Sequence, residues 1–354
     1  MNKSVAIDAR LIGGTATGDS TYWTGLLHGL AEIASTDSLL FFSNTEKPPG
    51  IPWRNEWRWI VVPSGSSRWW SLVAFPLAAR KAGAAAVHVQ YNLSPLVRSG
   101  ITTIHDVSFF IGPEWFGRKD RVLLQRFVPA TVRRSARVIA VSQTCREEIE
   151  RFIPDAKGKT EVTPEAAAPW IRSVERGAAK ARVSELVGVE EPYLFTLGTA
   201  WARKNQTLAV QAVSRYASGP RLYLGGKGGK GEVLPDRVRR LGYVAQSDLS
   251  AFYSGAEAFL LPSLHEGFGL TLLEAFECGC PVLCGNGGAL AEVAGGAATI
   301  VPTYDPQAWA DALERMLSSN LDALRELGRR RAAEFSWAAT ARLTRQVYEA
   351  VVNP

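Results

Sequence analysis

The chain has 354 residues, of which 46% are hydrophobic and 21% charged, so it can bury two cores and is neither a disordered chain nor a small disulfide scaffold. The formal net charge is +6, and the excess lies in the first 175 residues, where 21 Lys and Arg face 16 Asp and Glu. Nucleic acid, an anionic membrane surface or a phosphorylated acceptor would each account for this charge.

Short apolar segments alternate with amphipathic stretches along the whole chain, which is the pattern of parallel sheets covered by helices. We expect strands in the first half at 4–7, 39–42, 59–62, 86–89, 101–104 and 137–141. The second half repeats the rhythm at 193–197, 221–224, 238–243, 258–261, 281–284 and 298–301. Between the two series, residues 163–177 contain two prolines and a row of alanines and are expected to form a linker.

The sequence therefore predicts two Rossmann-like α/β domains, at 1–168 and 178–336, followed by a terminal helix at 337–354. Sheets of this kind bind ligands in the cleft at the carboxyl ends of their strands. No secretory signal is expected because Asp8 and Arg10 interrupt the first apolar segment. The longest uncharged stretch, 82–97, is too short and too polar to span a bilayer. Four clustered cysteines indicate a reducing compartment, so we expect a cytoplasmic protein.

Two features of the first half could carry function. His105 directly follows a buried strand, where an α/β domain exposes groups to its ligand, although a lone histidine is more often a structural residue. The stretch from Arg118 to Arg137 holds seven cations against one acid, Asp120. It is compatible with a solvated helix face and equally with attraction to an anionic membrane, at about 1 kcal/mol per well-placed cation.

The most informative stretch of the second half is PSLHEGFGLTLLEA, residues 262–275. A strand ends before it, and a loop containing Gly267 and Gly269 leads into a helix that we expect to begin near Leu270. Free backbone amides at such a helix start suit a diphosphate, and the glycines let the backbone approach it closely. Glu266 then lies in the loop facing a sugar, and Glu274 in the second helical turn can accept hydrogen bonds from ribose hydroxyls.

This string resembles the signature of the retaining GT-B glycosyltransferases of family 4, the mannosyltransferase-like group 1 enzymes, in which seven residues separate two glutamates. The resemblance implies a GT-B fold, with an acceptor domain first, a donor domain second and a final helix that crosses back to the first. Residues 203–205, Arg-Lys-Asn, match the variant whose basic pair contacts the donor pyrophosphate. Residues 105–109, His-Asp-Val-Ser-Phe, match the segment whose histidine contacts the transferred sugar.

The resemblance assigns catalysis to His105, Arg203, Lys204 and Glu266. It assigns donor contacts to Gly14, Gly198, Arg203, Lys204, Gly242, Tyr243, Val244, Glu266, Gly267, Phe268, Gly269, Leu270 and Glu274. One departure is Thr199, which stands where many members carry an arginine. Cys278, Cys280, Cys284 and His265 could be imagined as metal ligands, but we expect these cysteines to pack as small apolar groups beside a buried strand.

We therefore expect a retaining hexosyltransferase that needs no metal or other cofactor. GDP-mannose is the leading donor and a UDP-hexose the alternative. The expected acceptor is a glycan or lipid-linked glycan of cell-envelope polysaccharide synthesis, reached from the inner face of the membrane if Arg118 to Arg137 binds lipid. An epimerase of the same architecture would carry a different carboxylate pattern. A nucleic-acid-binding protein would explain the charge but not Glu266 and Glu274, so nucleic acid is not an expected partner.

Overall fold

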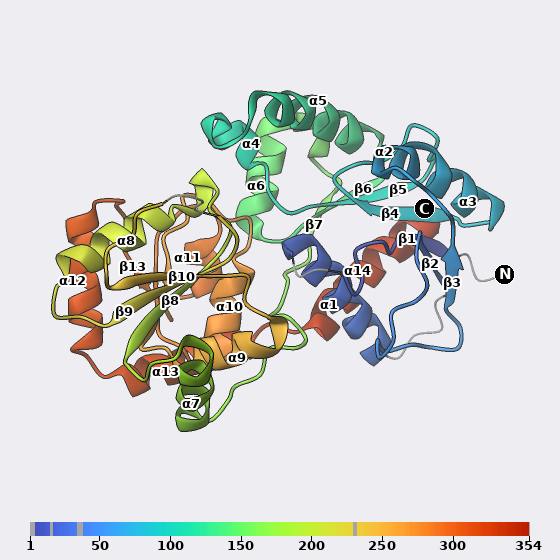
Figure 1. Ribbon diagram of the computed structural model, residues 1–354. Coiled ribbons are helices and arrows are strands. Elements are labelled where there is room, and N and C mark those ends of the chain that lie inside the picture. Colours follow the sequence, from blue (N-terminus) through green and yellow to red (C-terminus); the bar gives the residue numbers. More distant parts are fainter. Residues whose placement is uncertain (1–3, 15–16, 34–37, 229–231, 354) are drawn as a thin grey trace. The chain divides into compact units, whose positions relative to one another are not determined.

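The structure is a computed structural model that describes residues 4–14, 17–33, 38–228 and 232–353. It divides into two compact units: unit 1 is Met1–Pro169 with Ser336–Pro354, and unit 2 is Trp170–Phe335. Each unit is built on one parallel sheet with helices packed against it (Figure 1). The predicted class, two Rossmann-like α/β units, is confirmed.

The sheet of unit 1 has seven strands in the order β3-β2-β1-β4-β5-β6-β7, and every neighbouring pair is parallel. The order reverses between β1 and β4, which creates a topological switch point at their carboxyl ends. The six strands predicted for this half are confirmed, and β7, only three residues long, was not predicted. The strands are β1 (Val5–Asp8), β2 (Leu39–Ser43), β3 (Arg58–Val61), β4 (Ala86–Gln90), β5 (Gly100–Ile104), β6 (Arg137–Ala140) and β7 (Thr160–Val162).

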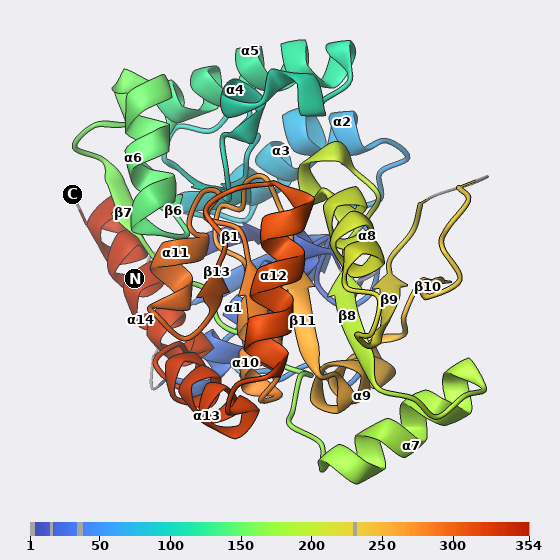
Figure 2. The same ribbon diagram turned by 90° about the vertical axis from the view of Figure 1, so that its left-hand side faces the viewer.

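One face of this sheet is covered by α1 (Gly18–Glu32) and the terminal helix α14 (Trp337–Val352), which lie side by side (Figures 1 and 2). Two glycines one turn apart on α1, Gly25 and Gly29, make this close packing possible. A Cβ atom on Gly29 would lie 1.9 Å from the carbonyl oxygen of Trp337. The Trp337 indole also donates a 2.8 Å hydrogen bond to the Ala167 carbonyl. The start of the terminal helix is thus fixed within unit 1.

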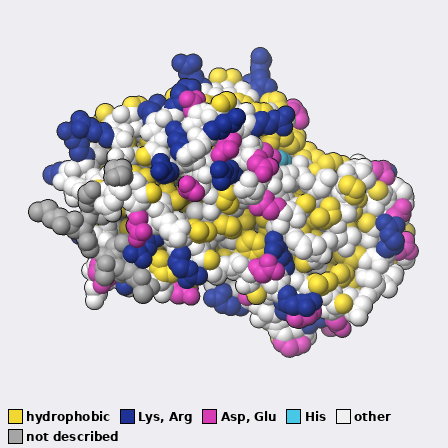
Figure 3. All heavy atoms as spheres, turned by 180° about the vertical axis from the view of Figure 1, so that it is seen from behind, with side chains coloured by type: hydrophobic (Ala, Val, Ile, Leu, Met, Phe, Trp, Pro, Cys, Tyr) yellow, Lys and Arg dark blue, Asp and Glu magenta, His cyan; other side chains and the backbone are white. Residues whose placement is uncertain are grey.

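The other face carries α3 (Phe75–Lys81), α5 (Arg118–Arg134) and α6 (Gln143–Phe152). Helix α5 holds most of the basic stretch expected from the sequence, and Lys and Arg side chains gather over it along the top of Figure 3. The stretch is not a single helix, because Arg137 opens β6. Shorter helical segments of unit 1 are α2 (Ser67–Trp69), η1 (Trp70–Ala74), α4 (Ser108–Ile111), η2 (Pro113–Trp115) and η3 (Pro154–Ala156).

The segment expected as a linker, 163–177, connects the two units. Thr163, Glu165, Ala166 and Ala168 are buried within unit 1, and Thr340 of α14 donates a hydrogen bond to the Pro164 carbonyl. The boundary between the units falls after residue 169. The predicted linker therefore contains this boundary, and its first residues pack within unit 1.

The sheet of unit 2 has six parallel strands in the order β10-β9-β8-β11-β12-β13. Its order reverses between β8 and β11, and all six strands predicted for this half are confirmed. Trp309, fully buried, packs with Leu194, Leu260 and Leu283 in the core on one side of the sheet. The strands are β8 (Tyr193–Leu197), β9 (Arg221–Gly225), β10 (Val238–Gly242), β11 (Ala258–Leu261), β12 (Val282–Cys284) and β13 (Thr299–Ile300).

Helices of unit 2 pack in two groups against this sheet. Helix α8 (Gln206–Arg215) packs with α12 (Pro306–Leu317). The second group comprises α7 (Arg176–Val187), α9 (Gln246–Gly255), α10 (Leu270–Glu277) and α13 (Leu321–Ala332). Two short segments complete the unit, η4 (Ala202–Lys204) after β8 and α11 (Leu290–Ala294) after β12. Helix α10 begins at Leu270, as predicted.

Candidate functional site

The topological switch point of unit 2 brings together two loops that are far apart in sequence. Strands β8 and β11 are parallel neighbours, so the loops that follow them, 198–205 and 262–269, leave the sheet at the same edge. The Leu264 amide donates a 2.8 Å hydrogen bond to the Arg203 carbonyl and ties the loops to each other. This edge is where open α/β sheets bind their ligands.

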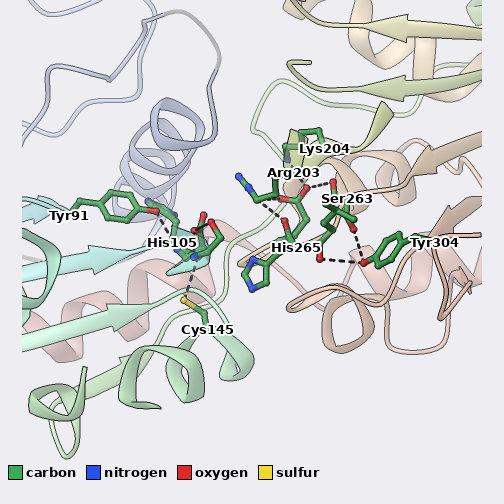
Figure 4. Close-up of polar contacts among 12 residues, drawn as sticks. Tyr91, His105, Cys145, Arg203, Lys204, Ser263, His265 and Tyr304 are labelled. Atoms are coloured by element: carbon green, nitrogen blue, oxygen red, sulfur yellow. Dashed lines mark hydrogen bonds and ion pairs between the residues drawn. The ribbon is translucent and has the colours of Figure 1, made fainter. Parts of the chain in front are cut away.

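A charged cluster of Arg203, Lys204, Ser263 and Glu266 forms where these loops meet (Figure 4). Lys204 Nζ lies 2.6 Å from one oxygen of the Glu266 carboxylate, and Arg203 Nη1 lies 3.3 Å from the other. Ser263 donates a 2.6 Å hydrogen bond to the oxygen that Lys204 contacts. Arg203 Nη1 also donates to the His265 carbonyl at 2.6 Å. Two residues predicted to bind a diphosphate and one predicted to face a sugar are therefore in direct contact.

The charges of this cluster set the ionisation of its carboxylate. Burial alone would raise the pKa of Glu266, whose side chain is 9% exposed. The positive charges of Lys204 and Arg203, with hydrogen bonds from Lys204 and Ser263, outweigh burial and lower this pKa to about 2. Glu266 is therefore ionised at neutral pH, and the cluster of two cations and one carboxylate keeps one net positive charge.

The loop after β12 holds the main chain of Glu266 in place. The Ala289 amide donates a 2.8 Å hydrogen bond to the Glu266 carbonyl, and Gly288 forms an isolated parallel bridge with Glu266. Gly288 has a φ of +64°, and a Cβ atom there would lie 2.1 Å from the Glu266 carbonyl oxygen. Only glycine fits this backbone conformation and this close contact. Tyr304, in the loop after β13, donates to the Ser263 and Leu264 carbonyls at 3.3 Å from each.

Helix α10 starts directly behind the charged cluster. Gly269 has a φ of +104°, a conformation that turns the chain into the helix and that other residues adopt only with strain. Phe268 is buried and packs edge to face with Phe335 at 5.8 Å between ring centres. The first amides of a helix have no partner within it, so those of Leu270 and Thr271 can bind an anion together with the positive end of the helix dipole.

Glu274, the second glutamate of the motif, lies in a different environment from Glu266. It is 6% exposed on α10 and accepts a 2.9 Å hydrogen bond from the Tyr253 hydroxyl of α9. Burial raises its pKa to about 7, and the Tyr253 hydrogen bond opposes this only in part. Near neutral pH this carboxyl is thus poised between its two protonation states.

The remaining predicted donor contacts of unit 2 lie at the same edge of the sheet. The Gly198 amide donates to the Gly225 carbonyl at 3.0 Å, and the Gly226 amide donates to the Gly242 carbonyl at 2.6 Å. A Cβ atom on Gly226 would meet the Gly198 carbonyl oxygen at 2.0 Å, so glycine is required there too. The ends of β8, β9 and β10 are joined in this way. Beyond Gly242, Tyr243 is 53% exposed and Val244 is buried.

His105, the predicted catalytic residue of unit 1, lies among polar and aromatic side chains. His105 follows β5, and its Nδ1 lies 3.0 Å from Glu165 Oε1 (Figure 4). Its ring packs edge to face on Tyr22 at 4.9 Å between ring centres. Burial would lower the pKa of His105, but the hydrogen bond and charge of Glu165 raise it above its ordinary value. Nε2 is buried and makes no hydrogen bond within the described part of the chain.

The turn after His105 is fixed by its neighbours. Asp106 accepts hydrogen bonds from the amide and hydroxyl of Ser108, at 2.8 and 2.5 Å. The Asp106 amide donates to the Tyr91 hydroxyl at 3.2 Å, and Tyr91 itself has a φ of +56°. Gly14 lies in the loop after β1, where its amide donates to the Leu11 carbonyl at 3.3 Å. Residues 15–16 of that loop lie outside the described residues.

Sequence reasoning missed four residues of these two groups: Ser263, Tyr304, Tyr91 and Glu165. Ser263 could have been found, because it begins the same loop as Glu266. The other three approach from segments distant in sequence, and their residue types alone carry no signal.

No group of three or more His, Cys, Asp or Glu that could hold a metal ion occurs among the described residues. Cys278, Cys280 and Cys284 are buried free thiols, as expected of small apolar groups. In the same part of the chain, no helix has the length and apolar character needed to cross a bilayer.

Residues 191–319, which contain the charged cluster and Glu274, match the family described as "Glycosyl transferases group 1". The chain is 30% identical over 283 residues to the O-antigen chain mannosyltransferase B of Escherichia coli, an alignment that covers 73% of this chain and 72% of that protein.

Solved structures share the fold of the chain. The sucrose-phosphate synthase of Thermosynechococcus elongatus superimposes with a TM-score of 0.77 at 21% identity, over 99% of each chain. The HepE protein of Anabaena, solved in complex with UDP and glucose, has a TM-score of 0.71 at 15% identity, over 99% of this chain and 100% of that one. The predicted GT-B fold is confirmed.

Proposed function

The chain belongs to the group 1 glycosyltransferases, and we propose that it transfers a mannosyl group from GDP-mannose, with retention of configuration, to a glycan or lipid-linked acceptor of the cell envelope. One observation carries this proposal: Arg203 and Lys204 meet Glu266 at the switch point of unit 2, directly before the start of α10. The cluster offers net positive charge and helix amides at one place, which is the chemistry that a nucleoside diphosphate requires.

In this proposal, the protein accelerates sugar transfer by stabilising the departing diphosphate. Negative charge grows on the bridging phosphate oxygen as the bond to the sugar breaks, and Arg203 and Lys204 are fixed cations that need no rearrangement to meet it. Glu266 holds both side chains in place before the donor arrives. It also limits the positive charge of the cluster, so that product release is not opposed by two uncompensated cations.

Retention follows if the acceptor hydroxyl attacks the face of the sugar that the diphosphate leaves. The leaving phosphate oxygen then takes the proton of that hydroxyl, and no pair of carboxylates needs to flank the bond as in a glycosidase. Protein cations take the place of a divalent ion in this scheme, so activity without added metal is expected. His105 contributes a hydrogen bond from Nε2 to the transferred sugar.

Mannose is the preferred sugar for two reasons. The relative from Escherichia coli is named a mannosyltransferase, and residues 105–109 resemble the segment found in mannosyl-type members of the family. A UDP-hexose is the alternative donor, favoured by the structural neighbour that was solved with UDP and glucose. The envelope role also rests on the Escherichia coli relative, whose name refers to O-antigen chains.

The test is a panel of GDP-, UDP- and ADP-sugars, followed by thermal shift and by donor turnover in the presence of EDTA. GDP-mannose should give the largest shift and the fastest turnover. Lys204→Ala should lower kcat/KM by roughly 100-fold or more, because it removes a preorganised charge from the leaving group. Glu274→Ala should weaken donor binding while the protein stays folded.

A matched control is Arg215→Ala, which removes a cation at the far end of α8 from η4 and should leave turnover unchanged. Turnover that stays at the wild-type rate in Lys204→Ala and Glu274→Ala would refute the site. A preference for a UDP-sugar would contradict GDP-mannose as the donor but would leave the assignment of the site residues intact. Conversion of the nucleotide sugar to its epimer without transfer would contradict the proposed transferase reaction and indicate an epimerase.

A further inference from the structure

One region of unit 1 exposes large apolar side chains among cations. Trp69 and Leu72, on α2 and η1, are 57% and 49% exposed, and Leu77 on α3 is 48% exposed. Leu96, in the loop after β4, is 52% exposed. Val122 and Phe127 of α5 are 56% and 49% exposed. We call the exposed side of residues 67–81, 93–98 and 118–134 the basic face.

These three segments lie next to one another. The Ser94 hydroxyl donates a 2.7 Å hydrogen bond to the Leu72 carbonyl, which joins the loop to η1. The Leu93 amide donates to the Thr131 hydroxyl at 3.1 Å, which joins the same loop to α5. Both ribbon views place α2 and α3 beside α5 (Figures 1 and 2). These six exposed apolar side chains therefore belong to neighbouring elements of unit 1.

The charge of this region is predominantly positive. The sequence contains no Asp or Glu between Glu56 and Asp106, while this interval contributes four cations to the basic face. In α5, Lys119, Val122 and Arg126 follow one another at helical spacing on the exposed side. Figure 3 shows yellow apolar side chains between the dark-blue ones over α5. The exposed or partly exposed cations of the face are Arg68, Arg80, Lys81, Arg98, Arg118, Lys119, Arg121, Arg126, Arg133 and Arg134.

Acidic groups lie at two points of the face. Asp120 is in the first turn of α5, and Asp155 lies 3.8 Å from Arg133. Both the aspartate and the arginine of this pair are about half exposed, so the pair is weak and leaves most of the positive charge available. A partner of the basic face must therefore carry negative charge to match the cations. The same partner must offer an apolar environment to the exposed tryptophan and leucines.

We propose that the basic face docks on the surface of an anionic lipid bilayer, with Trp69, Leu72 and Leu96 entering the headgroup region. An interfacial element combines cations that contact lipid phosphates with a tryptophan and leucines that enter the acyl boundary. Nucleic acid matches the cations but offers no medium for aliphatic side chains. The role of this docking rests on the proposed function, since a lipid-linked acceptor lies in the bilayer, but the docking itself does not depend on catalysis.

The experiment is co-sedimentation of the full chain with vesicles of phosphatidylcholine alone or with 30% phosphatidylglycerol, an amount chosen to be roughly that of an anionic membrane. Binding should require the anionic lipid and weaken as salt is raised. Lys119→Ala with Arg126→Ala should weaken it roughly 30-fold, at about fivefold per cation. Trp69→Ser with Leu72→Ser should weaken it roughly tenfold or more.

The control is Leu186→Ser, which removes an exposed leucine from α7 of unit 2 and should leave vesicle binding unchanged. Donor turnover without acceptor is measured on every variant and should stay at the wild-type rate. Failure to bind anionic vesicles overturns the proposal even if turnover is normal, whereas lost turnover with intact binding overturns only the proposed function. Binding unaffected by the apolar pair, or binding to an oligonucleotide but not to vesicles, also overturns it.

Discussion

Replacing Glu274 by glutamine should stabilise the protein at alkaline pH. Burial raises the pKa of this carboxyl from 4.5 to about 7. An unfolded glutamate ionises at the lower value, so ionisation favours the unfolded state as pH rises between the two. Each unit of difference is worth about 1.4 kcal/mol, which gives a destabilisation of about 1 kcal/mol at pH 5 and about 3 kcal/mol at pH 8. Glutamine is neutral at both and still accepts the Tyr253 hydrogen bond.

The measurement is urea unfolding followed by circular dichroism at pH 5, 6.5 and 8, with the free energy of unfolding extrapolated to water. The gain of Glu274→Gln over the wild type should grow across this series. Glu277→Gln, in the same helix but partly exposed, is the matched control and should change the free energy by less than about 0.5 kcal/mol. An equal gain at pH 5 and pH 8 would refute the argument, because the effect would then not come from ionisation.

The same substitution should impair donor binding under the proposed function. An ionised Glu274 accepts two hydrogen bonds from ribose hydroxyls, whereas the protonated carboxyl accepts fewer. Donor affinity of the wild type should therefore increase as pH rises through about 7, the value near which this carboxyl ionises. Isothermal titration with GDP at pH 6 and 8 tests this. A glutamine variant with wild-type affinity and the same pH dependence would remove Glu274 from the site.

Three further predictions concern other contacts. Lys204→Met should lower the free energy of unfolding at pH 7 by about 3 kcal/mol, because Glu266 loses its closer cation. This loss of stability should become smaller below about pH 4, where the Glu266 carboxylate of the variant takes up a proton. Glu165→Gln should shift the imidazole titration of His105, followed by NMR, to lower pH, since the carboxylate is what keeps that pKa raised. Gly29→Ala should destabilise unit 1 by about 1–3 kcal/mol or more in urea unfolding, because the terminal helix must move away.

Matched controls separate these effects from general damage. Gly18→Ala adds a methyl group on the same helix as Gly29, where nothing lies within 4 Å, and should change the free energy by less than about 0.5 kcal/mol. Glu161→Gln removes an exposed carboxylate of β7 and should leave the His105 titration in place. The Lys204 argument fails if the loss of stability is the same at pH 7 and at pH 3.5.

The strand pattern could be predicted from the sequence because parallel strands are buried on both faces and appear as short apolar runs. β7 was not predicted because it has only three residues and its middle residue, Glu161, is exposed, so it does not form an apolar run. The order of the strands could not be predicted, since it depends on crossovers that no local pattern encodes. The burial of 163–168 could not be predicted for a related reason: it comes from contacts within unit 1, which include Thr340, far away in the sequence.

The candidate site was predictable to the extent that its residues stand next to strand ends. Lys204 and Glu266 each follow an apolar strand within eight residues, so two parallel neighbours were enough to bring them together. Glu165 and His105 are 60 residues apart, and Tyr304 lies two strands beyond Ser263, so their contacts depend on the complete topology. The direction of each pKa shift could not be predicted from the sequence either, because it depends on which side chains surround a carboxyl.

The side chains that surround Glu266 and Glu274 give the two glutamates of the motif different roles. Glu266 faces two cations, so its pKa falls to about 2 and its ionised form stabilises the fold above about pH 4. Glu274 is buried and accepts a hydrogen bond from a tyrosine hydroxyl; burial outweighs that bond, so its pKa rises and its ionised form destabilises the fold. A sequence selected for stability alone would carry glutamine at 274, and retaining an ionisable group there is reasonable only if a ligand contacts it. Donor binding supplies hydrogen-bond donors to the ionised form, and the cost of burial is then offset when the donor is bound.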